Sequence, residues 1–377
     1  MIAAVLKETT AGENRVSATP QTVKELIKSG LTVRVQTGAG DASHYPDQDY
    51  QNAGAEICAD AAATSANANI ILKVASPTLE EMDLIPNGSA FVSLFQTTRE
   101  IQQVKALANK NITGFSMHLI PRTTLAQSMD ALSSQANIAG YKSVLIGAAH
   151  LPVYMPLLMT AAGTIPPAKV LILGAGVAGL QAIATAKRLG AQVEAFDVRP
   201  EVKEQVESLG AKFVEVDSDG DDGVGEGGYA KETSDDYKQR QQELIKQHIA
   251  KSDLVITTAL IPGRPAPLLI PTDMVNGMKP GSAIIDLAAE NGGNCELTQG
   301  GEVIEYNGVK IDGTLNLPSS MQVHASQLYA KNVSTFVTYM VKDGELNLDM
   351  DDEIISGAMF THQGKITHEP TREALNA

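Results

Sequence analysis

Short apolar runs alternate with amphipathic stretches through the first part of the chain. The runs are rich in β-branched residues, as strands are, and lie at residues 1–7, 32–37, 70–75, 89–95 and 112–117. Between them, TPQTVKELIKSG carries apolar residues at helical spacing, with Thr19 as the expected N-cap, Pro20 at the first position and Gly30 at the end. This alternation predicts a parallel α/β sheet.

The same alternation restarts at residue 169. Strand-like runs follow at residues 170–173, 211–216, 252–260, 282–288 and 309–315. They predict a second α/β domain with a parallel sheet of its own.

Two long segments, residues 128–149 and 318–341, predict long helices. We interpret both as connectors, so that the tail returns to the first domain and the second domain is an insertion. The expected division is residues 1–136 with 319–377 as an N-terminal domain completed by the tail, and residues 137–318 as the inserted domain. A cleft between the two domains is where we expect a ligand to bind.

Residues 143–167 contain no Asp, Glu, Lys or Arg and are numerous enough to span a bilayer. His150 and the prolines at 152, 156, 166 and 167 would interrupt such a helix repeatedly. We therefore expect this segment to be buried core, with a transmembrane helix as the alternative.

Composition narrows the class of protein. The chain has 377 residues, of which 43% are hydrophobic and 19% charged, as expected for two ordered, soluble domains. A net charge of −15 argues against nucleic-acid binding, which requires a basic face. The two cysteines, Cys58 and Cys295, form no paired spacing, and the seven histidines lack metal-ligand spacing, so we expect neither a disulfide framework nor a metal site. The apolar start reaches Lys7 too soon for a signal peptide.

A Gly-rich turn follows the strand at 170–173. Gly174 allows a tight turn, Gly176 lets the backbone approach a pyrophosphate, and Gly179 permits close packing of the next helix on the strand. This arrangement predicts dinucleotide binding. The fold class is therefore α/β, with two Rossmann-like domains that have parallel sheets and are joined by two long helices with a cleft between them.

Asp197 ends the next strand, where a carboxylate can accept hydrogen bonds from the adenosine ribose and repel a 2′-phosphate. This favours NAD(H) over NADP(H). Arg199 complicates the prediction, because an arginine just past the acid can accommodate a 2′-phosphate, although Pro200 could turn it outward.

An acidic, Gly-rich loop at residues 217–236 interrupts the second domain. It contains five glycines and eight acidic residues, too few apolar groups to order itself. Tyr229, beside Gly228, is its only aromatic residue. The loop is either a solvated insertion or a mobile lid over a nucleotide.

Residues 121–135 (PRTTLAQSMDALSSQ) place Arg122 in a loop and Gln127, Asp130 and Ser133 at three-residue steps. In a helix these last three would lie on neighbouring positions of one face. Such donors and acceptors suit a nicotinamide carboxamide and a pyrophosphate. A capped, solvated helix start is the alternative.

Seven motifs together make the chain resemble the NAD(H)-binding component of the proton-translocating nicotinamide nucleotide transhydrogenases, over essentially its full length. They are NRVSATP, PRTTLAQSMDALSSQANIAGYKSV, GAGVAGLQAIATAKRLGA, AFDVRP, EGGYAKE, TTALIPGRPAP and ENGGN.

The resemblance implies roles for individual residues. Arg122, Asp130 and Ser133 would hold the nicotinamide end of NAD(H), and Gln127 would face a second nucleotide. Tyr229 would fold over the bound nucleotide. The remaining residues implied to contact it are Gly174, Gly176, Val177, Gly179, Asp197, Val198, Arg199, Gly228, Gln241 and Leu260.

The resemblance also implies an activity with partners. Hydride would pass from NADH bound here to NADP⁺ on a separate NADP(H)-binding domain, and a transmembrane component would couple the transfer to proton movement. The chain would form a homodimer and be cytoplasmic, peripheral at the inner membrane.

Alanine dehydrogenase shares the implied fold and is an alternative. That enzyme anchors a keto acid with residues matching Arg15 and Lys73, and it needs a histidine to protonate the substrate oxygen. The matching stretch FVSLFQ has no histidine, and Glu290 stands where the catalytic Asp would be. A non-catalytic NAD sensor is a further alternative.

Overall fold

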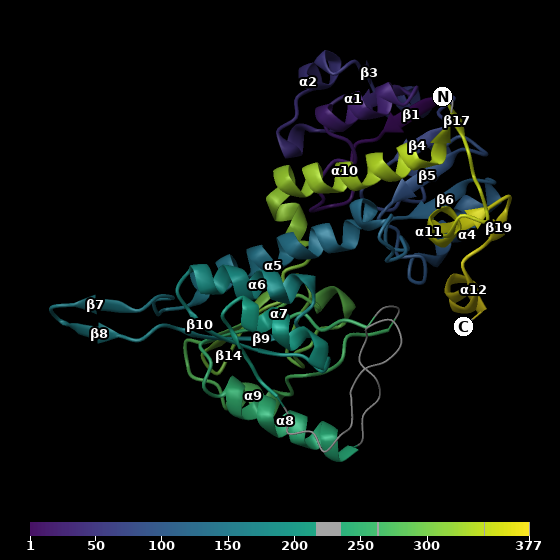
Figure 1. The fold of residues 1–377 in the computed structure, drawn as a ribbon. Coiled ribbons are helices and arrows are strands. Elements are labelled where there is room, and N and C mark those ends of the chain that lie inside the picture. Colours follow the sequence, from purple (N-terminus) through teal and green to yellow (C-terminus); the bar gives the residue numbers. More distant parts are fainter. Residues whose placement is uncertain (216–234, 262–263, 343, 377) are drawn as a thin grey trace. The chain divides into compact units, whose positions relative to one another are not determined.

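The computed structural model describes residues 1–215, 235–261, 264–342 and 344–376. It consists of two compact units, Met1–Gln135 with Pro318–Ala377, and Ala136–Leu317 (Figure 1). These bounds differ by one residue from those expected. Each unit is an α/β structure, so the predicted fold class is confirmed at that level. The two helical linkers and the cleft stay predictions.

The first unit has an eight-stranded sheet in the order β19-β18-β6-β5-β4-β1-β2-β3. The six strands from the beginning of the chain pair in parallel: β1 (Ile2–Val5), β2 (Thr32–Gln36), β3 (Glu56–Cys58), β4 (Ile70–Leu72), β5 (Ala90–Ser93) and β6 (Thr113–Ser116). The tail adds β18 (Met359–His362) antiparallel to β6, and β19 (Lys365–Ile366) antiparallel to β18. The five predicted strands are confirmed, whereas β3, β18 and β19 were not predicted.

Both faces of this sheet are buried. Along β1, Ala3 and Val5 join one apolar cluster, while Ala4 belongs to another on the opposite face. Alternate residues of a strand point to opposite faces, so a strand that is apolar throughout requires cover on both. The helices of this unit are α1 (Pro20–Lys28), α2 (Asp47–Asn52), α3 (Ala61–Ser65), α4 (Ile101–Asn109), α10 (Gln322–Met340), α11 (Glu353–Ala358) and α12 (Glu369–Asn376).

α1 begins as the sequence predicts. The Thr19 side chain accepts a hydrogen bond from Thr22 N, the Thr22 hydroxyl accepts one from Thr19 N, and Pro20 occupies the first position. Two otherwise unpaired amides are satisfied by this reciprocal cap.

α10 lies entirely within the first unit and is a core helix there, not a connector. Tyr329, Val333, Phe336 and Met340 are fully buried in the same cluster as β1. The reason is its composition: apolar residues on several sides of the helix must be covered on several sides.

The second unit has a seven-stranded sheet in the order β11-β10-β9-β12-β13-β15-β14. All neighbours pair in parallel except β14 with β15. The strands are β9 (Lys169–Leu173), β10 (Gln192–Phe196), β11 (Lys212–Phe213), β12 (Leu254–Thr257), β13 (Ala283–Asp286), β14 (Val303–Tyr306) and β15 (Val309–Asp312). The strand order reverses between β9 and β12, and in open α/β sheets ligands bind beyond the carboxyl ends of the strands at such a point.

Helices α6 (Val177–Arg188), α7 (Lys203–Ser208), α8 (Asp235–Ile249) and α9 (Thr272–Asn276) belong to the same unit. Its buried apolar residues form two clusters: Val170 and Ile172 of β9 belong to one, and Leu171 and Leu173 to the other. This sheet is therefore also covered on both faces.

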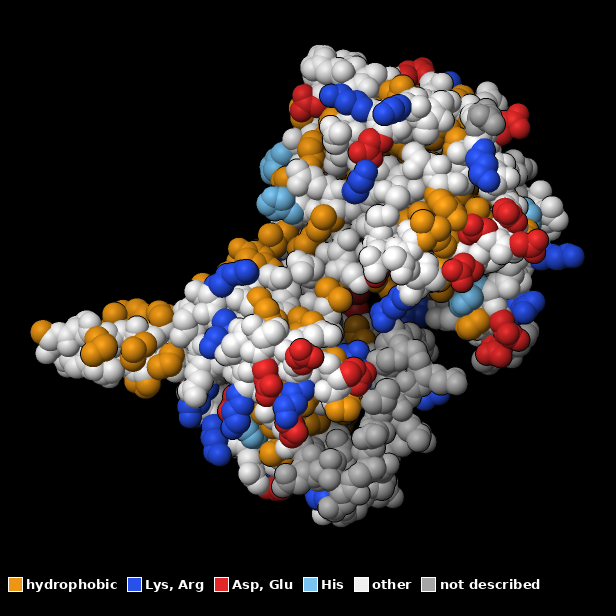
Figure 2. Space-filling model, in the orientation of Figure 1, with side chains coloured by type: hydrophobic (Ala, Val, Ile, Leu, Met, Phe, Trp, Pro, Cys, Tyr) orange, Lys and Arg blue, Asp and Glu red, His pale blue; other side chains and the backbone are white. Residues whose placement is uncertain are grey.

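The uncharged segment 143–167 is only partly core, so the expectation of a wholly buried segment is wrong. Its beginning lies in α5 (Ala131–His150), where Val144 is buried. It continues into an antiparallel hairpin of β7 (Leu158–Thr160) and β8 (Gly163–Ile165) that extends from the second unit. Figure 2 shows hydrophobic side chains along the hairpin, where Met159 is 72% exposed. In the described residues of the chain, no helix is both long and apolar enough to span a bilayer.

Candidate functional site

The Gly-rich turn connects β9 to α6 at the point where the strand order reverses. Gly174 has a φ of +103°, and a Cβ there would lie 2.5 Å from Thr258 Oγ1. A Cβ at Gly179 would lie 1.9 Å from Gly174 O, so α6 packs on the turn with no room for a side chain. At Gly176, in contrast, a Cβ would meet nothing within 4 Å. The backbone is therefore open to a ligand at Gly176.

The N-terminus of α6 is suited to an anion. Its N-cap, Gly176, has no side chain to bond the amides of the first turn, which have no partner within the helix. These amides and the helix dipole attract negative charge. Val177, the next residue, is 42% exposed and lines a cavity of ≈ 420 Å³ on the α6 and α7 side of the unit. The residues of this turn fit the pyrophosphate of a dinucleotide.

Asp197 directly follows β10 and contacts the Gly-rich turn. Its Oδ2 accepts a hydrogen bond from Ala175 N at 2.7 Å, and its Oδ1 accepts one from Arg199 N at 2.9 Å. The Arg199 guanidinium donates from Nε to Oδ1 and from Nη2 to Oδ2, each at 3.0 Å. Val198, between them, packs at the edge of an apolar cluster. The structure therefore brings Asp197 and Arg199 to the turn, as an ion pair.

The loop after β12 is fixed by Asn294, which is fully buried. The Asn294 amide donates to Ala259 O at 2.9 Å and to Pro267 O at 2.8 Å, and its Oδ1 accepts from Ala259 N at 3.0 Å. Leu260, the next residue, is 46% exposed. Asn294 thus ties two parts of the loop that presents Leu260.

Asp286, at the end of β13, is buried and holds Asn294 in turn. The donors to its carboxylate are Thr257 Oγ1, Ala288 N, Asn294 N, Cys295 N and Thr298 Oγ1. A buried carboxylate is stable only when it is hydrogen-bonded this fully. Sequence reasoning missed both residues. The available signals were an acid ending a buried strand and the ENGGN motif, which was used only for the resemblance.

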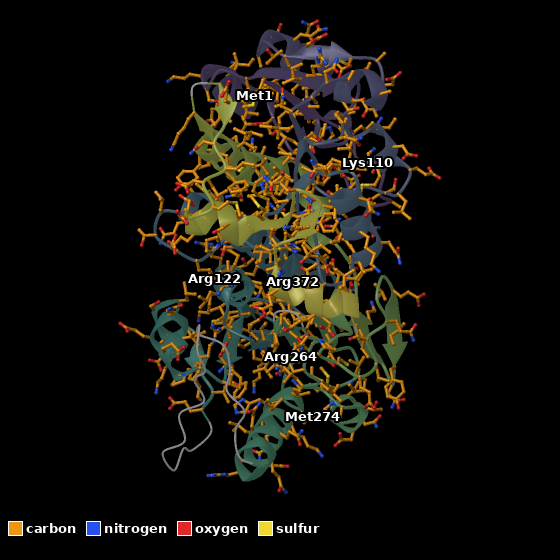
Figure 3. All side chains as sticks on the ribbon, turned by 90° about the vertical axis from the view of Figure 1, so that its right-hand side faces the viewer. Met1, Lys110, Arg122, Arg264, Met274 and Arg372 are labelled. Carbon is orange, nitrogen blue, oxygen red and sulfur yellow. The ribbon has the colours of Figure 1, made fainter. Side chains whose placement is uncertain are left out.

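In the first unit, Asp130 and Ser133 meet at the start of α5. The Asp130 carboxylate accepts hydrogen bonds from Ser133 N at 2.9 Å and from Ser133 Oγ at 2.6 Å. This is the geometry of a helix N-cap, so the capped helix start is present. Arg122 is exposed in the loop after β6 (Figure 3).

Gln127 lies on a separate short 3₁₀ helix, η3 (Gln127–Met129). Asp130 has a ψ of 85°, which ends that helix before α5 begins at Ala131. The prediction that Gln127, Asp130 and Ser133 share one helix face is therefore wrong. An acid that caps α5 takes a non-helical backbone, which separates the two helices.

Three predicted residues have less structural support. Gly228 and Tyr229 lie outside the described residues. Gln241 is half-buried on α8. Its link to the Gly-rich turn stays a prediction.

A cluster of buried charges lies in the first unit. Lys73 Nζ is fully buried and lies 2.7 Å from Glu81 Oε1 and 3.7 Å from Glu8 Oε2. Arg15 pairs with Glu13 at 2.6 Å. The two cations that match the substrate anchors of alanine dehydrogenase therefore each have carboxylate partners in their own chain.

Two groups in this cluster have displaced pKa values. Burial raises the pKa of the Glu8 carboxyl to about 7, against the opposing effect of the Lys73 charge. Burial also lowers the pKa of His118 to about 4, with a further contribution from the Arg15 charge. His118 is therefore neutral at neutral pH.

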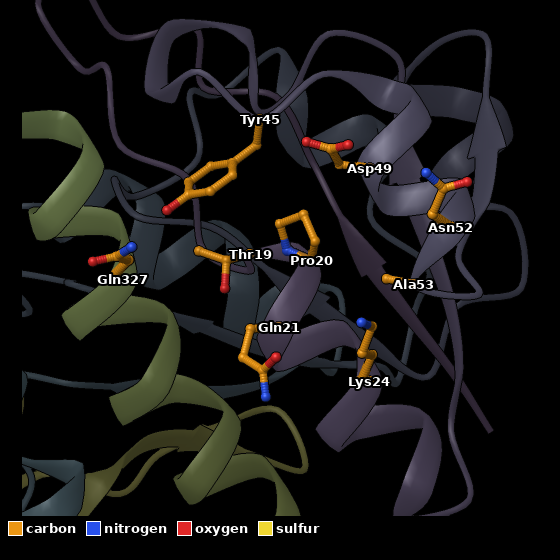
Figure 4. Close-up of a pocket in the computed structure, with 9 residues that line it drawn as sticks. All are labelled: Thr19, Pro20, Gln21, Lys24, Tyr45, Asp49, Asn52, Ala53 and Gln327. Carbon is orange, nitrogen blue, oxygen red and sulfur yellow. The ribbon is translucent and has the colours of Figure 1, made fainter.

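A second cavity, of ≈ 410 Å³, lies in the first unit (Figure 4). None of the predicted site residues lines it. The lining residues are Thr19, Pro20, Gln21, Lys24, Tyr45, Asp49, Asn52, Ala53 and Gln327.

Comparison with known families assigns nearly the whole chain. Residues 4–139 match the family described as "Alanine dehydrogenase/PNT, N-terminal domain", and residues 143–369 match "Alanine dehydrogenase/PNT, C-terminal domain". The chain belongs to the alanine dehydrogenase/PNT family. Dehydrogenases and transhydrogenases bind nicotinamide nucleotides, in agreement with the Gly-rich turn.

Individual relatives separate the two branches of the family. The chain is 46% identical to the first portion of NAD(P) transhydrogenase subunit alpha from Rhodospirillum rubrum over 373 residues, 97% of each chain. A crystal structure of a transhydrogenase from Sinorhizobium meliloti matches with a TM-score of 0.88 and 46% identity, covering 97% of this chain and 100% of that one. An L-alanine dehydrogenase structure has a TM-score of 0.85 but 26% identity, covering 100% and 99%. The resemblance predicted from the motifs is confirmed, and alanine dehydrogenase is more distant.

We expect Asn294→Ala to loosen the loop that carries Leu260. The substitution leaves Ala259 and Pro267 without their side-chain partners and should cost about 1–3 kcal/mol in the free energy of unfolding. Urea denaturation followed by circular dichroism measures this cost. Asn276→Ala, which changes an exposed asparagine at the end of α9, is the matched control, and an equal loss in both variants would contradict the assignment.

The raised pKa of Glu8 predicts a pH dependence of stability. Because the pKa in the folded state lies above the unfolded value of 4.5, the folded state holds this proton more tightly. Its contribution is present below about pH 4.5 and is lost as the pH rises through about 7. Between pH 5 and pH 8, the urea midpoint should fall less in Glu8→Gln than in the wild type. Glu80→Gln, at an exposed position, should keep the wild-type fall; identical behaviour of all three proteins would contradict the prediction.

Proposed function

We propose that this chain is the NAD(H)-binding subunit of an NAD(P) transhydrogenase. It transfers a hydride from NADH to NADP⁺ held on a separate NADP(H)-binding domain, and it acts only with its partner components. The observation that carries the proposal is the likeness to transhydrogenase alpha subunits over nearly the full chain. The Gly-rich turn at the switch point of the second sheet supports it.

The residues of the second unit would bind the adenosine and pyrophosphate side of NAD(H). Amides at the start of α6 would bind the pyrophosphate, with Gly176 leaving room for it. Asp197 would accept hydrogen bonds from the ribose hydroxyls. Val177, Val198, Arg199 and Leu260 border the same turn or the loops beside it, which supports their assignment as contact residues.

The residues of the first unit would orient the nicotinamide end. Asp130 and Ser133 offer a carboxylate and a hydroxyl that already share a hydrogen bond, a fixed pair suited to a carboxamide. Arg122 and Gln127 are exposed nearby in the sequence and would contact the nicotinamide and the second nucleotide. Roles for Gly228, Tyr229 and Gln241 rest on the resemblance alone.

This division of labour agrees with the chemistry. The dihydronicotinamide ring supplies the hydride, and no oxygen changes its protonation at the reacting carbon. The protein therefore needs no general acid or base there. Its residues instead fix the ring, exclude water and hold the reacting groups in line.

The rival reaction, reduction of a keto acid, requires an acid at the substrate oxygen. FVSLFQ supplies none, and the only histidine that the sequence places near the site residues, His118, is neutral at neutral pH. We therefore place the chain with the transhydrogenases. Oxidation of NADH by the purified chain with pyruvate and ammonia alone would overturn this choice.

We further propose that two copies of the chain form a homodimer through the β7–β8 hairpin. Its exposed apolar residues are Val153, Tyr154, Leu157, Met159 and Ile165. A chain of net charge −15 repels a second copy over most of its surface, but this segment carries no charge at all. Exposed apolar surface of this kind is typical of an interface.

The remaining partner is a transmembrane component that couples hydride transfer to proton movement. The chain itself would lie in the cytoplasm, peripheral at the inner membrane, through its attachment to that component. Both statements follow from the resemblance. Proton uptake into vesicles that contain the full complex, dependent on added chain, tests them.

Hydride transfer in a reconstituted system tests the main proposal. The pure chain, mixed with an NADP(H)-binding domain, should reduce an NAD analogue at the expense of NADPH. Arg122→Ala and Asp130→Asn should slow transfer at least about tenfold, and more than they weaken NADH binding, because they orient the ring at the reacting step. Lys28→Ala, which removes an exposed cation at the end of α1, is the control.

Two results would count against this assignment. If the wild-type chain gives no transfer above background, the proposed function fails. If Arg122→Ala and Asp130→Asn weaken NADH binding as much as they slow transfer, these residues are anchors and do not orient the ring.

Adding charge to the hairpin should separate the dimer. Leu157→Asp with Met159→Asp places two carboxylates on the proposed interface, where they would be buried against apolar groups at high cost. Sedimentation equilibrium should show a shift from dimer to monomer. Leu79→Asp alters an apolar residue of similar exposure in the first unit and should leave the wild-type state unchanged. A monomeric wild type, or a dimeric double variant, would refute the hairpin interface.

A further inference from the structure

The Asp197 carboxylate is fully occupied by donors of its own chain. A carboxylate has about four lone-pair sites, and four donors reach this one. Two come from backbone amides, Ala175 N and Arg199 N. The other two come from the Arg199 guanidinium, in a bidentate pair with both distances at 3.0 Å. The Asp197 side chain is 6% exposed and that of Arg199 is 23% exposed.

Only the guanidinium can leave this arrangement. Ala175 N belongs to the Gly-rich turn, and Arg199 N is held between β10 and Pro200, whose ring fixes the backbone where η4 (Pro200–Val202) begins. The guanidinium stands on a flexible side chain. Hydroxyl groups of a ribose can therefore bond Asp197 only at the positions that the guanidinium now holds.

We propose that Asp197 selects NAD(H) in two ways: it repels a 2′-phosphate, and it sequesters Arg199, the cation that would otherwise bind that phosphate. The inference rests on the proposed function, since it assumes that the nucleotide binds at this turn. Arginine forks match phosphate as well as they match carboxylate, so an arginine released at this point is a ready 2′-phosphate site.

The two ways make different predictions for the same variant. If repulsion acts alone, removing the charge of Asp197 improves NADPH binding whether or not Arg199 is present. If sequestration contributes, the improvement depends on Arg199. A double-mutant cycle between the two positions separates these cases.

The experiment measures NADH and NADPH binding to the full chain by calorimetry. Asp197→Asn should raise the affinity for NADPH relative to NADH by about 10- to 100-fold, in line with one bidentate arginine–phosphate contact. Arg199→Ala alone should leave the preference for NADH in place. The double variant should lose most of the gain, and the gain in Asp197→Asn should shrink as salt is raised, because the new contact is ionic.

The controls keep the outcomes distinct. Arg188→Ala removes an exposed cation from the end of α6 and should not alter the gain in an Asp197→Asn background. Asp197→Ser removes the same charge with a smaller side chain and repeats the test should Asp197→Asn fail to fold. A double variant that retains the full gain overturns the proposal. Failure of the wild type to bind NADH would instead overturn the proposed function.

Discussion

The geometry of the nucleotide-binding unit depends on contacts where no side chain fits. A Cβ at Gly179 would lie 1.9 Å from Gly174 O, and a Cβ at Gly140 of α5 would lie 2.1 Å from Ala178 O. Helix α6 is thus held by direct backbone contact on two sides. Its first turn is thereby fixed beyond the carboxyl ends of β9 and β12, where the strand order reverses. The anion-binding amides, Asp197 and the loop held by Asn294 all take their positions from this packing.

Local spacing predicted the parts of the site that local spacing determines. The Gly-rich turn and Asp197 were found because a strand, a turn, a helix and a second strand follow one another within some thirty residues. The support of Leu260 could not be found in this way. It depends on hydrogen bonds from Asn294 to Ala259 and Pro267, which are distant in sequence, and a polar side chain carries no mark of its partner. The pairing of Arg199 with Asp197 was missed for the same reason, although only one residue separates them.

The fold was predicted where hydrophobic patterns are long and failed where they are short or ambiguous. β3 has three residues and β18 has four, too few to establish a period. The uncharged segment 143–167 suggested core because apolar residues are normally buried within their own chain. The pattern reports that a surface avoids water, but not which molecule covers it. The same limit applies to α10, whose apolar faces belong to one unit and not to a connection between two.

The first unit is assembled from both ends of the chain, and this affects how it can form. The β6 edge of its parallel sheet pairs with β18, and the Tyr329 hydroxyl of α10 donates to Lys73 O across 256 positions of sequence. During synthesis, residues 136–317 leave the ribosome before these closing elements exist. The inserted unit is therefore free to fold first, while the six amino-terminal strands wait with an open edge. A strand edge exposed for that long invites pairing with other chains, which makes the interval before residue 359 emerges the point at which misassembly threatens this protein most.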